Sequence, residues 1–127
     1  MSLSPHRLIL SALRGGSGKT ILCLGLAAAW QTRGYKVATF KKGPDFIDAG
    51  WLSYASGHPC RNLDPFLMTP QQIVQSFLIH SDGADVSLIE GNRGLFDGLD
   101  PDGCCSTAEL VRILRSPVII KIGRAHV

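Results

Sequence analysis

Residues 15–20 (Gly-Gly-Ser-Gly-Lys-Thr) combine the residue types that bind a polyphosphate. Glycines permit a tight turn in which successive backbone N–H groups point at phosphate oxygens. Lys19 would then contact the outer phosphates, and the Thr20 hydroxyl would take a position on Mg²⁺. We therefore expect this segment to bind ATP together with Mg²⁺. The expected nucleotide-binding residues are Gly15, Gly16, Ser17, Gly18, Lys19 and Thr20.

The sequence on either side of this loop supports the interpretation. Apolar residues 8–10 predict a buried strand before it, and residues 21–31 have apolar side chains at helical spacing after it. A helix that begins at the loop adds its N-terminal partial positive charge to the site. The full motif has a further glycine where this chain has Leu13. The alternative is a glycine-rich turn that contains a lysine by chance, but it does not explain why strand, loop and helix follow in this order.

Two other loops with charged side chains also follow apolar strands. One spans residues 41–50, and the other begins at residue 90 and is rich in glycine and aspartate. Ligands gather at the carboxyl ends of parallel strands, so we expect both loops to meet the phosphate loop. The candidate residues of the two loops are Lys41, Lys42, Asp45, Asp48, Glu90 and Asp97.

These residue types suit phosphoryl transfer. An acid at the end of an apolar strand can hold Mg²⁺ directly or through water, which is the role expected for Glu90. Asp45 follows a Gly-Pro turn that would bring it to the same edge, where it could hold a second magnesium contact or orient a nucleophile. Lys41 could neutralise charge that develops on a transferring phosphoryl group. The predicted metal ligands are Thr20, Asp45 and Glu90.

Each of these side chains also has a plainer interpretation. Glu90 could be an exposed charge at the end of a strand, and Lys41 and Lys42 could form a solvated edge. Asp48 could cap a short helix, and Asp97 could stabilise a turn. The phosphate loop favours the functional interpretation of Glu90 most strongly. For the two lysines and the two aspartates, both interpretations stay open.

Strands and helices are expected to alternate along the chain, which is typical of an α/β fold with a parallel sheet and flanking helices. Thr69 and Ser106 are each followed three residues later by Gln or Glu, a capping-box pattern that marks a helix start. We expect a P-loop nucleotide-binding fold whose sheet is incomplete at its C-terminal end. The expected strands cover residues 7–12, 36–40, 85–90 and 117–120, and the expected helices cover 19–32, 51–56, 70–80 and 107–115.

The composition indicates one compact domain. Its 127 residues are 45% hydrophobic and 18% charged, which suffices for a core, and no apolar run is long enough to span a bilayer. A net charge of +3 is too small and too scattered to indicate a nucleic-acid partner. Four cysteines without metal-ligand spacing and the lack of a signal peptide favour the cytoplasm.

Residues 121–127 (Lys-Ile-Gly-Arg-Ala-His-Val) differ in character from the rest of the chain. A DNA sequence that encodes them matches a common sequencing adapter, so we interpret them as a non-native tail. The alternative is a natural basic terminus, which would follow the last strand without turn-forming residues. We expect residues 1–120 to be the N-terminal part of a synthetase domain whose native sequence continues differently.

Three segments of the chain resemble the cobyrinate a,c-diamide synthases. They are residues 41–50 (Lys-Lys-Gly-Pro-Asp-Phe-Ile-Asp-Ala-Gly), 61–65 (Arg-Asn-Leu-Asp-Pro) and 90–98 (Glu-Gly-Asn-Arg-Gly-Leu-Phe-Asp-Gly). The resemblance extends over about residues 7–120. It implies the fold of dethiobiotin synthetase and, more distantly, of the partition ATPases.

The resemblance also implies an ATP-dependent amidation in cobalamin biosynthesis. ATP would phosphorylate the a and c acetate carboxylates of cobyrinate or hydrogenobyrinate, and ammonia would then displace phosphate from the acyl phosphate. The residues to which the resemblance assigns catalysis are Lys41, Asp45, Asp48 and Asp97, and those to which it assigns substrate contacts are Asn62 and Asp64.

Members of this family usually add a C-terminal glutamine amidotransferase domain that supplies ammonia from glutamine. No cysteine here lies in the tight strand-to-helix turn that holds the glutaminase nucleophile, so we expect this chain to lack that activity and to be inactive by itself. The resemblance allows a homodimer and implies neither a nucleic-acid nor a membrane partner.

Two other functions stay open at this point. A related ligase could act on nickel-sirohydrochlorin or, as an ATP-dependent carboxylase, on another acceptor. A partition-type ATPase would instead switch by nucleotide-dependent dimerisation. Such ATPases carry a lysine where this chain has Arg14, and they lack the Gly-Pro-Asp-Phe-Ile-Asp segment.

Overall fold

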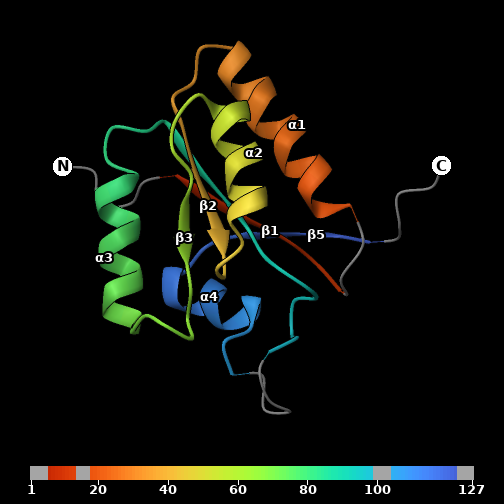
Figure 1. Ribbon diagram of the computed structural model, residues 1–127, viewed down its shortest axis with the longest axis vertical. Coiled ribbons are helices and arrows are strands. Elements are labelled where there is room, and N and C mark those ends of the chain that lie inside the picture. Colours follow the sequence, from red (N-terminus) through yellow and green to blue (C-terminus); the bar gives the residue numbers. More distant parts are fainter. Residues whose placement is uncertain (1–5, 14–17, 99–103, 123–127) are drawn as a thin grey trace.

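The computed structural model describes residues 6–13, 18–98 and 104–122, which form a layered α/β fold (Figure 1). Five parallel strands lie in the order β3-β2-β4-β1-β5. The strands are β1 (Arg7–Ala12), β2 (Val37–Lys42), β3 (Arg61–Leu63), β4 (Val86–Glu90) and β5 (Val118–Lys121). The helices are α1 (Lys19–Thr32), α2 (Phe46–Ser56), α3 (Pro70–His80) and α4 (Thr107–Leu114). The predicted fold class is confirmed.

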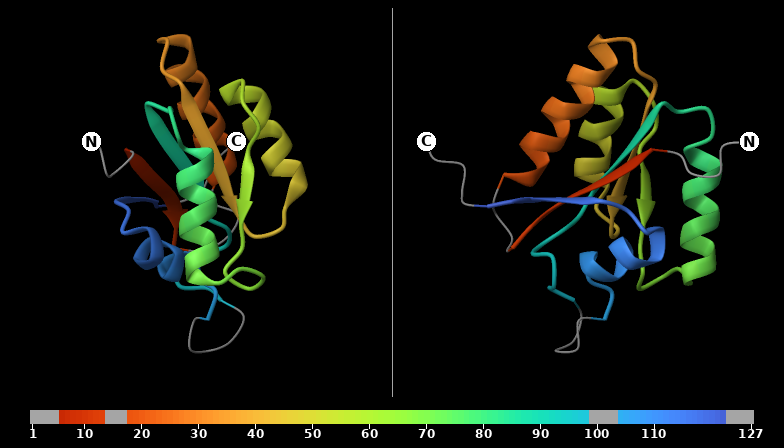
Figure 2. Two further views of the ribbon diagram at one scale, coloured as in Figure 1. Left: turned by 90° about the vertical axis from the view of Figure 1, so that its left-hand side faces the viewer. Right: turned by 180° about the vertical axis from the view of Figure 1, so that it is seen from behind.

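Helices cover both faces of this sheet. Figures 1 and 2 show α1 beside α2 on one face, with α3 and α4 on the other. Successive strand residues point to opposite faces, so Leu10 packs with Cys23 and Leu52 under α1 and α2, whereas Ile9 packs with Phe77 on the opposite side. Burial on both faces explains why the central strands are apolar runs rather than alternating patterns.

The sheet has one more strand than the sequence predicted. Residues 61–63 form β3, which pairs with the end of β2 through Lys41 and Asn62. A strand of three residues is too short to show a period of its own, which is why the sequence does not predict it. Pairing with β2 therefore supplies the order that the local sequence does not.

The helix α2 begins earlier than predicted, at Phe46 rather than near Trp51. Its N-cap is Asp45, whose Oδ1 accepts hydrogen bonds from the backbone N–H groups of Ile47 and Asp48 at 2.9 and 3.1 Å. The Gly-Pro-Asp sequence therefore opens a helix instead of extending a loop. This change places Asp48 in the first turn of α2.

Of the two predicted capping boxes, the one at Thr69 is complete and the one at Ser106 is only half formed. Thr69 and Gln72 form the complete reciprocal box, with side chain to backbone distances of 2.9 and 3.1 Å. Ser106 caps α4 as predicted and accepts from the Glu109 N–H at 3.2 Å. The Glu109 carboxylate, however, accepts from the N–H of Cys105 at 2.8 Å, one residue before the cap.

The helices are short. The helix α1 has 14 residues, and at about 1.5 Å per residue it falls short of the roughly 30 Å hydrocarbon layer of a bilayer. Over residues 6–13, 18–98 and 104–122, no helix has the length and apolar character that crossing a membrane requires.

Gly91 allows α4 to approach the end of β4, and this contact can be tested. A Cβ at Gly91 would lie 2.7 Å from Cγ2 of Thr107 and 3.3 Å from the Leu10 carbonyl oxygen. We predict that Gly91→Ala lowers the free energy of unfolding by about 1–3 kcal/mol in urea denaturation, because neither neighbour can retreat freely.

The matched control is Gly25→Ala, in the interior of α1. Apart from its chain neighbours and the nearby backbone of α1, no described atom lies within 4 Å of a Cβ built there. We therefore expect the same substitution to raise stability by about 0.5–1 kcal/mol through helix propensity. A Gly91→Ala chain as stable as Gly25→Ala would contradict the close packing of α4 against β4.

Candidate active site

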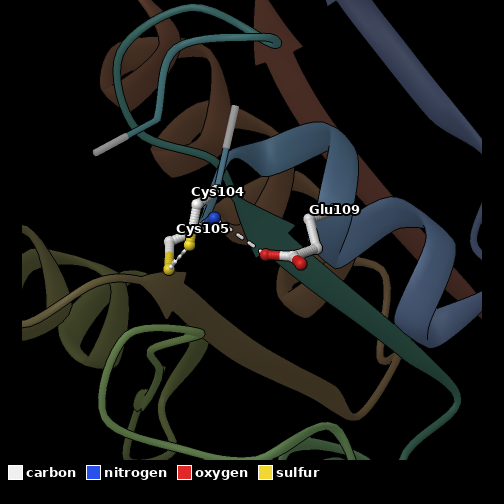
Figure 3. A group of neighbouring side chains, drawn as sticks. All are labelled: Cys104, Cys105 and Glu109. Atoms are coloured by element: carbon white, nitrogen blue, oxygen red, sulfur yellow. Dashed lines mark hydrogen bonds between the residues drawn. The ribbon is translucent and has the colours of Figure 1, made fainter. Parts of the chain in front are cut away.

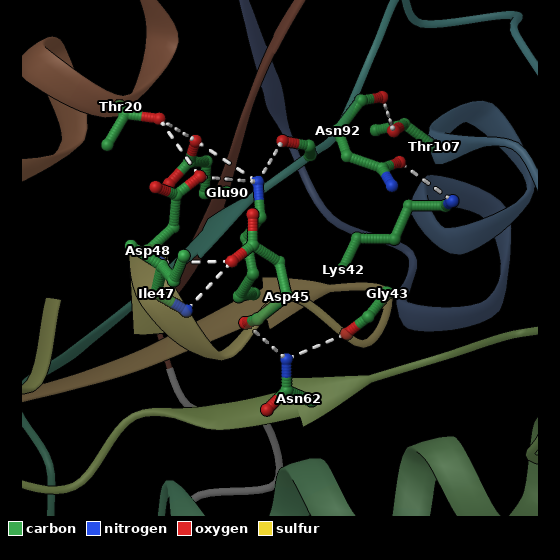
Figure 4. Close-up of polar contacts among 12 residues, drawn as sticks. Thr20, Lys42, Gly43, Asp45, Ile47, Asp48, Asn62, Glu90, Asn92 and Thr107 are labelled. Carbon is green, nitrogen blue, oxygen red and sulfur yellow. Dashed lines mark hydrogen bonds and ion pairs between the residues drawn. The ribbon is translucent and has the colours of Figure 1, made fainter. Parts of the chain in front are cut away.

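Glu90 lies at the centre of a polar cluster at the carboxyl ends of the strands. Figure 4 shows Thr20 and Asp48 directed at it from α1 and α2. The Thr20 hydroxyl donates to Glu90 Oε2 at 2.6 Å, and Lys41 Nζ lies 3.2 Å from the same oxygen. Thr20 at the start of α1, Lys41 at the end of β2 and Glu90 at the end of β4 therefore meet at one edge of the sheet, as predicted.

The strand register explains this position. Glu90 pairs with Lys41 of β2 and with Leu10 of β1, so it occupies the middle of the sheet. Leu88 precedes it by two residues and packs in the core beneath α1 and α2, so the Glu90 side chain points to that same face. Glu90 is only 1% exposed, which excludes the interpretation of an exposed strand-end charge.

Lys41 supplies the positive charge that balances this buried acid. It is 3% exposed, and Nζ also donates to the Gly91 carbonyl oxygen at 3.3 Å and lies 3.6 Å from Asp48 Oδ2. A buried carboxylate is tolerated when it is paired and hydrogen-bonded. The interpretation of a solvated edge is therefore wrong for Lys41.

Asp48 is the second acid of the cluster. Its Oδ2 accepts from the Thr20 hydroxyl at 3.4 Å. The interpretation that Asp48 caps a helix is wrong, because Asp45 is the cap of α2. Asp45 is exposed, and a backbone hydrogen bond from Asp48 is the main cause that lowers its pKa. The acid beside Thr20 is therefore Asp48, and a metal-binding role for Asp45 stays a prediction.

The cluster has the chemistry of a magnesium site. Its candidate ligands are the Thr20 hydroxyl and the carboxylates of Asp48 and Glu90, all oxygen donors of the kind that Mg²⁺ prefers. Glu90 Oε1 is buried and has no hydrogen-bond partner among the residues that the structure describes. An acceptor in that state fits an ion or its bound water.

The start of α1 fits a phosphate group. Gly18 is the N-cap in the left-handed region at φ 84°, and Lys19 is the first helical residue. Burial lowers the pKa of Lys19, and the positive charge of nearby Lys41 lowers it further. An anion that binds here would relieve that repulsion. Gly15, Gly16 and Ser17 lie outside the described residues.

The remaining predicted residues have structural contacts. Asn62 Nδ2 donates to the backbone carbonyls of Gly43 and Asp45 at 2.7 and 3.1 Å, so it holds the turn between β2 and α2. Asp64 accepts from the N–H of Phe66, and Asp97 accepts from the N–H of Gly94 at 3.0 Å. The turn-forming role considered for Asp97 is thus present in the structure.

Lys42 and Asn92 form a polar pair that was not predicted from the sequence. Lys42 is 6% exposed, and its Nζ donates to Asn92 Oδ1 at 2.9 Å (Figure 4). Lys41 and Lys42 are consecutive strand residues, so their side chains leave opposite faces of the sheet. This alternation could have shown that the two lysines lie on opposite faces. It could not be applied because the sequence predicted a strand that ends at residue 40, before both lysines.

A cavity of about 280 Å³ lies on the Lys42 side of the strand ends. Its lining residues Lys42 and Asn92 follow Lys41 and Glu90 of the polar cluster by one and two positions in the sequence. Its wall includes Asp64 and Asp97, to which the resemblance assigned a substrate contact and a catalytic role. The lining residues that bear charge or an aromatic ring are Lys42, Asp64, Phe66, Arg93 and Asp97.

Cys105 forms part of the same wall and lies beside Cys104 (Figure 3). The two sulfur atoms are 3.0 Å apart, and one atom of each, with a carboxylate oxygen of Glu109, lies within 4.8 Å of the others. The cysteine spacing predicted no such grouping. The hydrogen bond with Cys104 raises the pKa of Cys105 to about 11, so this thiol is protonated at neutral pH and is a poor nucleophile.

Comparison with known families fits this geometry. The sequence profile of the CobQ/CobB/MinD/ParA nucleotide binding domain matches residues 8–58, the segment that carries Thr20, Lys41 and Asp48. Over that segment the chain is similar to this family. The domain is named for nucleotide binding, which agrees with the positions of Lys19 and Thr20 at the start of α1 and with the buried acid Glu90.

Curated relatives extend the match beyond that segment. The chain is 50% identical over 120 residues to the cobyrinate a,c-diamide synthase of Magnetococcus marinus, covering 94% of this chain and 26% of that protein. It is 46% identical over 125 residues to that of Syntrophotalea carbinolica, covering 98% and 27%. It is 41% identical over 117 residues to the hydrogenobyrinate a,c-diamide synthase of Streptomyces coelicolor, covering 91% and 24%.

The predicted resemblance is confirmed over nearly the whole chain. The chain nevertheless spans only about a quarter of the length of these relatives. Their named activity belongs to the longer proteins, so its transfer to this chain is a matter of proposal.

The buried ion pair makes a stability prediction. Glu90→Leu would leave Lys41 with Asp48 as its remaining acidic partner at 3.6 Å, so we expect a loss of about 3–5 kcal/mol in the free energy of unfolding. The double variant Lys41→Met/Glu90→Leu removes both charges and should recover most of that loss. Urea denaturation measures both. A single variant as stable as wild type would show that the pair is not buried as described.

Proposed function

We propose that this chain is the nucleotide-binding part of an ATP-dependent amidoligase that acts on the a and c acetate groups of cobyrinate or hydrogenobyrinate. The observation that carries the proposal is the convergence of Thr20, Lys41 and Asp48 on buried Glu90. Sequence identity of 41–50% to synthases named for these substrates supports the choice of acceptor.

The chemistry begins with an unreactive carboxylate. Its carbonyl is stabilised by resonance, and its negative charge repels both the γ-phosphate and ammonia. In the proposed reaction a carboxylate oxygen attacks the γ-phosphorus and ADP leaves. Ammonia then attacks the carbonyl carbon of the acyl phosphate, phosphate leaves, and a proton is lost from nitrogen to give the amide.

The chain's own residues bring these like charges together. Lys19 and the N-terminus of α1 bind the triphosphate, and Lys41 offsets negative charge where the phosphoryl group moves. Thr20, Asp48 and Glu90 would hold Mg²⁺, which supplies further charge neutralisation when bound. Holding two reactants in place removes much of the entropic part of the barrier.

We place the acceptor on the Lys42 side of the strand ends. The cavity there is open and includes the exposed ring of Phe66, an apolar surface suited to a macrocycle. Asp64 and Asp97 line it, which keeps the substrate and catalytic roles that the resemblance implied for them within the proposal.

The ammonia source is proposed to be glutamine, hydrolysed by a part of the protein outside this segment. Burial raises the pKa of Cys23 and raises that of Cys60 to about 11. With Cys105 also protonated at neutral pH, these three thiols lack the thiolate character of a glutaminase nucleophile. We further propose that residues 1–120 contribute to the synthetase domain and that 121–127 are a non-native tail.

The test uses the complete polypeptide that contains this segment, with ammonia as donor. Cobyrinate labelled with ¹⁸O in its carboxylates should transfer one labelled oxygen to phosphate for each amide formed. Asp48→Asn and Glu90→Gln should each lower kcat by about 10²–10³, because each removes charge that stabilises the transition state.

Asp82→Asn is the control, since Asp82 is an exposed acid on the turn after α3. It should leave kcat unchanged. Unlabelled phosphate would refute the acyl phosphate, and near-normal turnover by Glu90→Gln would refute the site. Turnover of nickel-sirohydrochlorin in place of both corrin substrates would keep the mechanism and change the acceptor.

A further inference from the structure

Lys42 carries a buried positive charge that makes no ion-pair contact with an acid of the described residues. It is 6% exposed, and its hydrogen-bond partner is the neutral amide of Asn92. The ion pairs of the described residues involve Lys41 and leave Lys42 without a carboxylate in contact. Burial lowers the pKa of Lys42, against the weaker attraction of Asp64. A desolvated cation in this state is costly unless an anion joins it.

The cavity offers donors from three neighbouring side chains. Lys42, Asn92 and Arg93 all line it. The Lys42 ammonium has no acceptor atom, so Asn92 must turn its carbonyl oxygen toward it and keep the amide Nδ2 for another partner. Lys42 uses one of its three N–H groups for that bond. Both side chains therefore retain donors for a single carboxylate.

The acids of the cavity are already engaged. Asp64 accepts from the Phe66 N–H at 2.9 Å, and Asp97 accepts from the Gly94 N–H at 3.0 Å. These bonds hold the carboxylates to their own turns rather than to Lys42. The cavity therefore has a cationic side at Lys42 and an aromatic wall at Phe66.

We propose that Lys42 and Asn92 form an anion subsite that binds a second carboxylate of the acceptor, different from the one that is phosphorylated. The inference rests on the proposed function, in which the acceptor carries several peripheral carboxylates. Lys41 serves the nucleotide side of the sheet and Lys42 the acceptor side. When one carboxylate of the acceptor is bound at Lys42, the position of the macrocycle determines which of its acetate groups reaches the γ-phosphate of ATP.

The first test measures binding of cobyrinate and of Mg-ATP to the complete polypeptide. Lys42→Met should raise the Kd for cobyrinate by about tenfold or more and leave the Kd for Mg-ATP within about twofold. In steady state, KM for cobyrinate should rise while kcat changes little, because the lost contact is present in ground and transition states alike. The control is Lys36→Met, which removes the same charge from an exposed position.

A second variant has the opposite effect on stability. Asn92→Asp gives Lys42 an internal counter-ion, so it should raise the melting temperature and still weaken cobyrinate binding by about tenfold. This variant keeps the inference testable if Lys42→Met fails to fold. Equal Kd values for Lys42→Met and Lys36→Met would overturn the subsite. A matching loss of Mg-ATP affinity would overturn it too, since Lys42 would then belong to the nucleotide site.

Acylation of lysines, followed by mass spectrometry, separates this inference from the proposed function. If wild-type protein binds no cobyrinate, the proposed acceptor is wrong. Protection of Lys42 by citrate would then still support a carboxylate subsite, and its absence would overturn it. Protection by inorganic phosphate but not by citrate would also overturn it, because the ligand would then be a phosphate.

Discussion

The buried ion pair between Glu90 and Lys41 is the interaction on which the strand ends depend. Two charges that are 1% and 3% exposed must be compensated within the protein. Their partners come from separate elements, with Thr20 on α1 and Asp48 on α2. The pair therefore stays favourable only while α1 and α2 remain packed against the sheet. The same contacts thus stabilise the fold and set the geometry of the site.

Much of the frame could be predicted because its signals are local. The helix that begins at Lys19 and the cap at Thr69 each depend on residues within a few positions of one another. The central strands were predictable because both of their faces are covered, which produces unbroken apolar runs. The convergence of Glu90 with Thr20 followed from the rule that parallel strands end at one edge.

The missed features depend on contacts distant in sequence. The strand β3 exists through its pairing with β2, and the start of α2 depends on whether the Asp45 side chain turns back to its own backbone. Because the helix was expected to begin at residue 51, the sequence placed both Asp45 and Asp48 in a loop. It could not predict that Asp45 caps α2 while Asp48 faces Thr20. The Lys42–Asn92 pair joins positions 50 residues apart, which no local pattern can reveal.

The adjacency of Lys41 and Lys42 has an evolutionary consequence. Because the pleat assigns neighbouring residues to opposite faces, inserting or deleting one residue in β2 would exchange the two ammonium groups across the sheet. A substitution at Lys41 or Lys42 changes the charge on one face of the sheet only, whereas a change in the length of this strand alters both faces at once. Lineages that diversify should therefore vary residue type along β2 and conserve its spacing to the Gly-Pro turn.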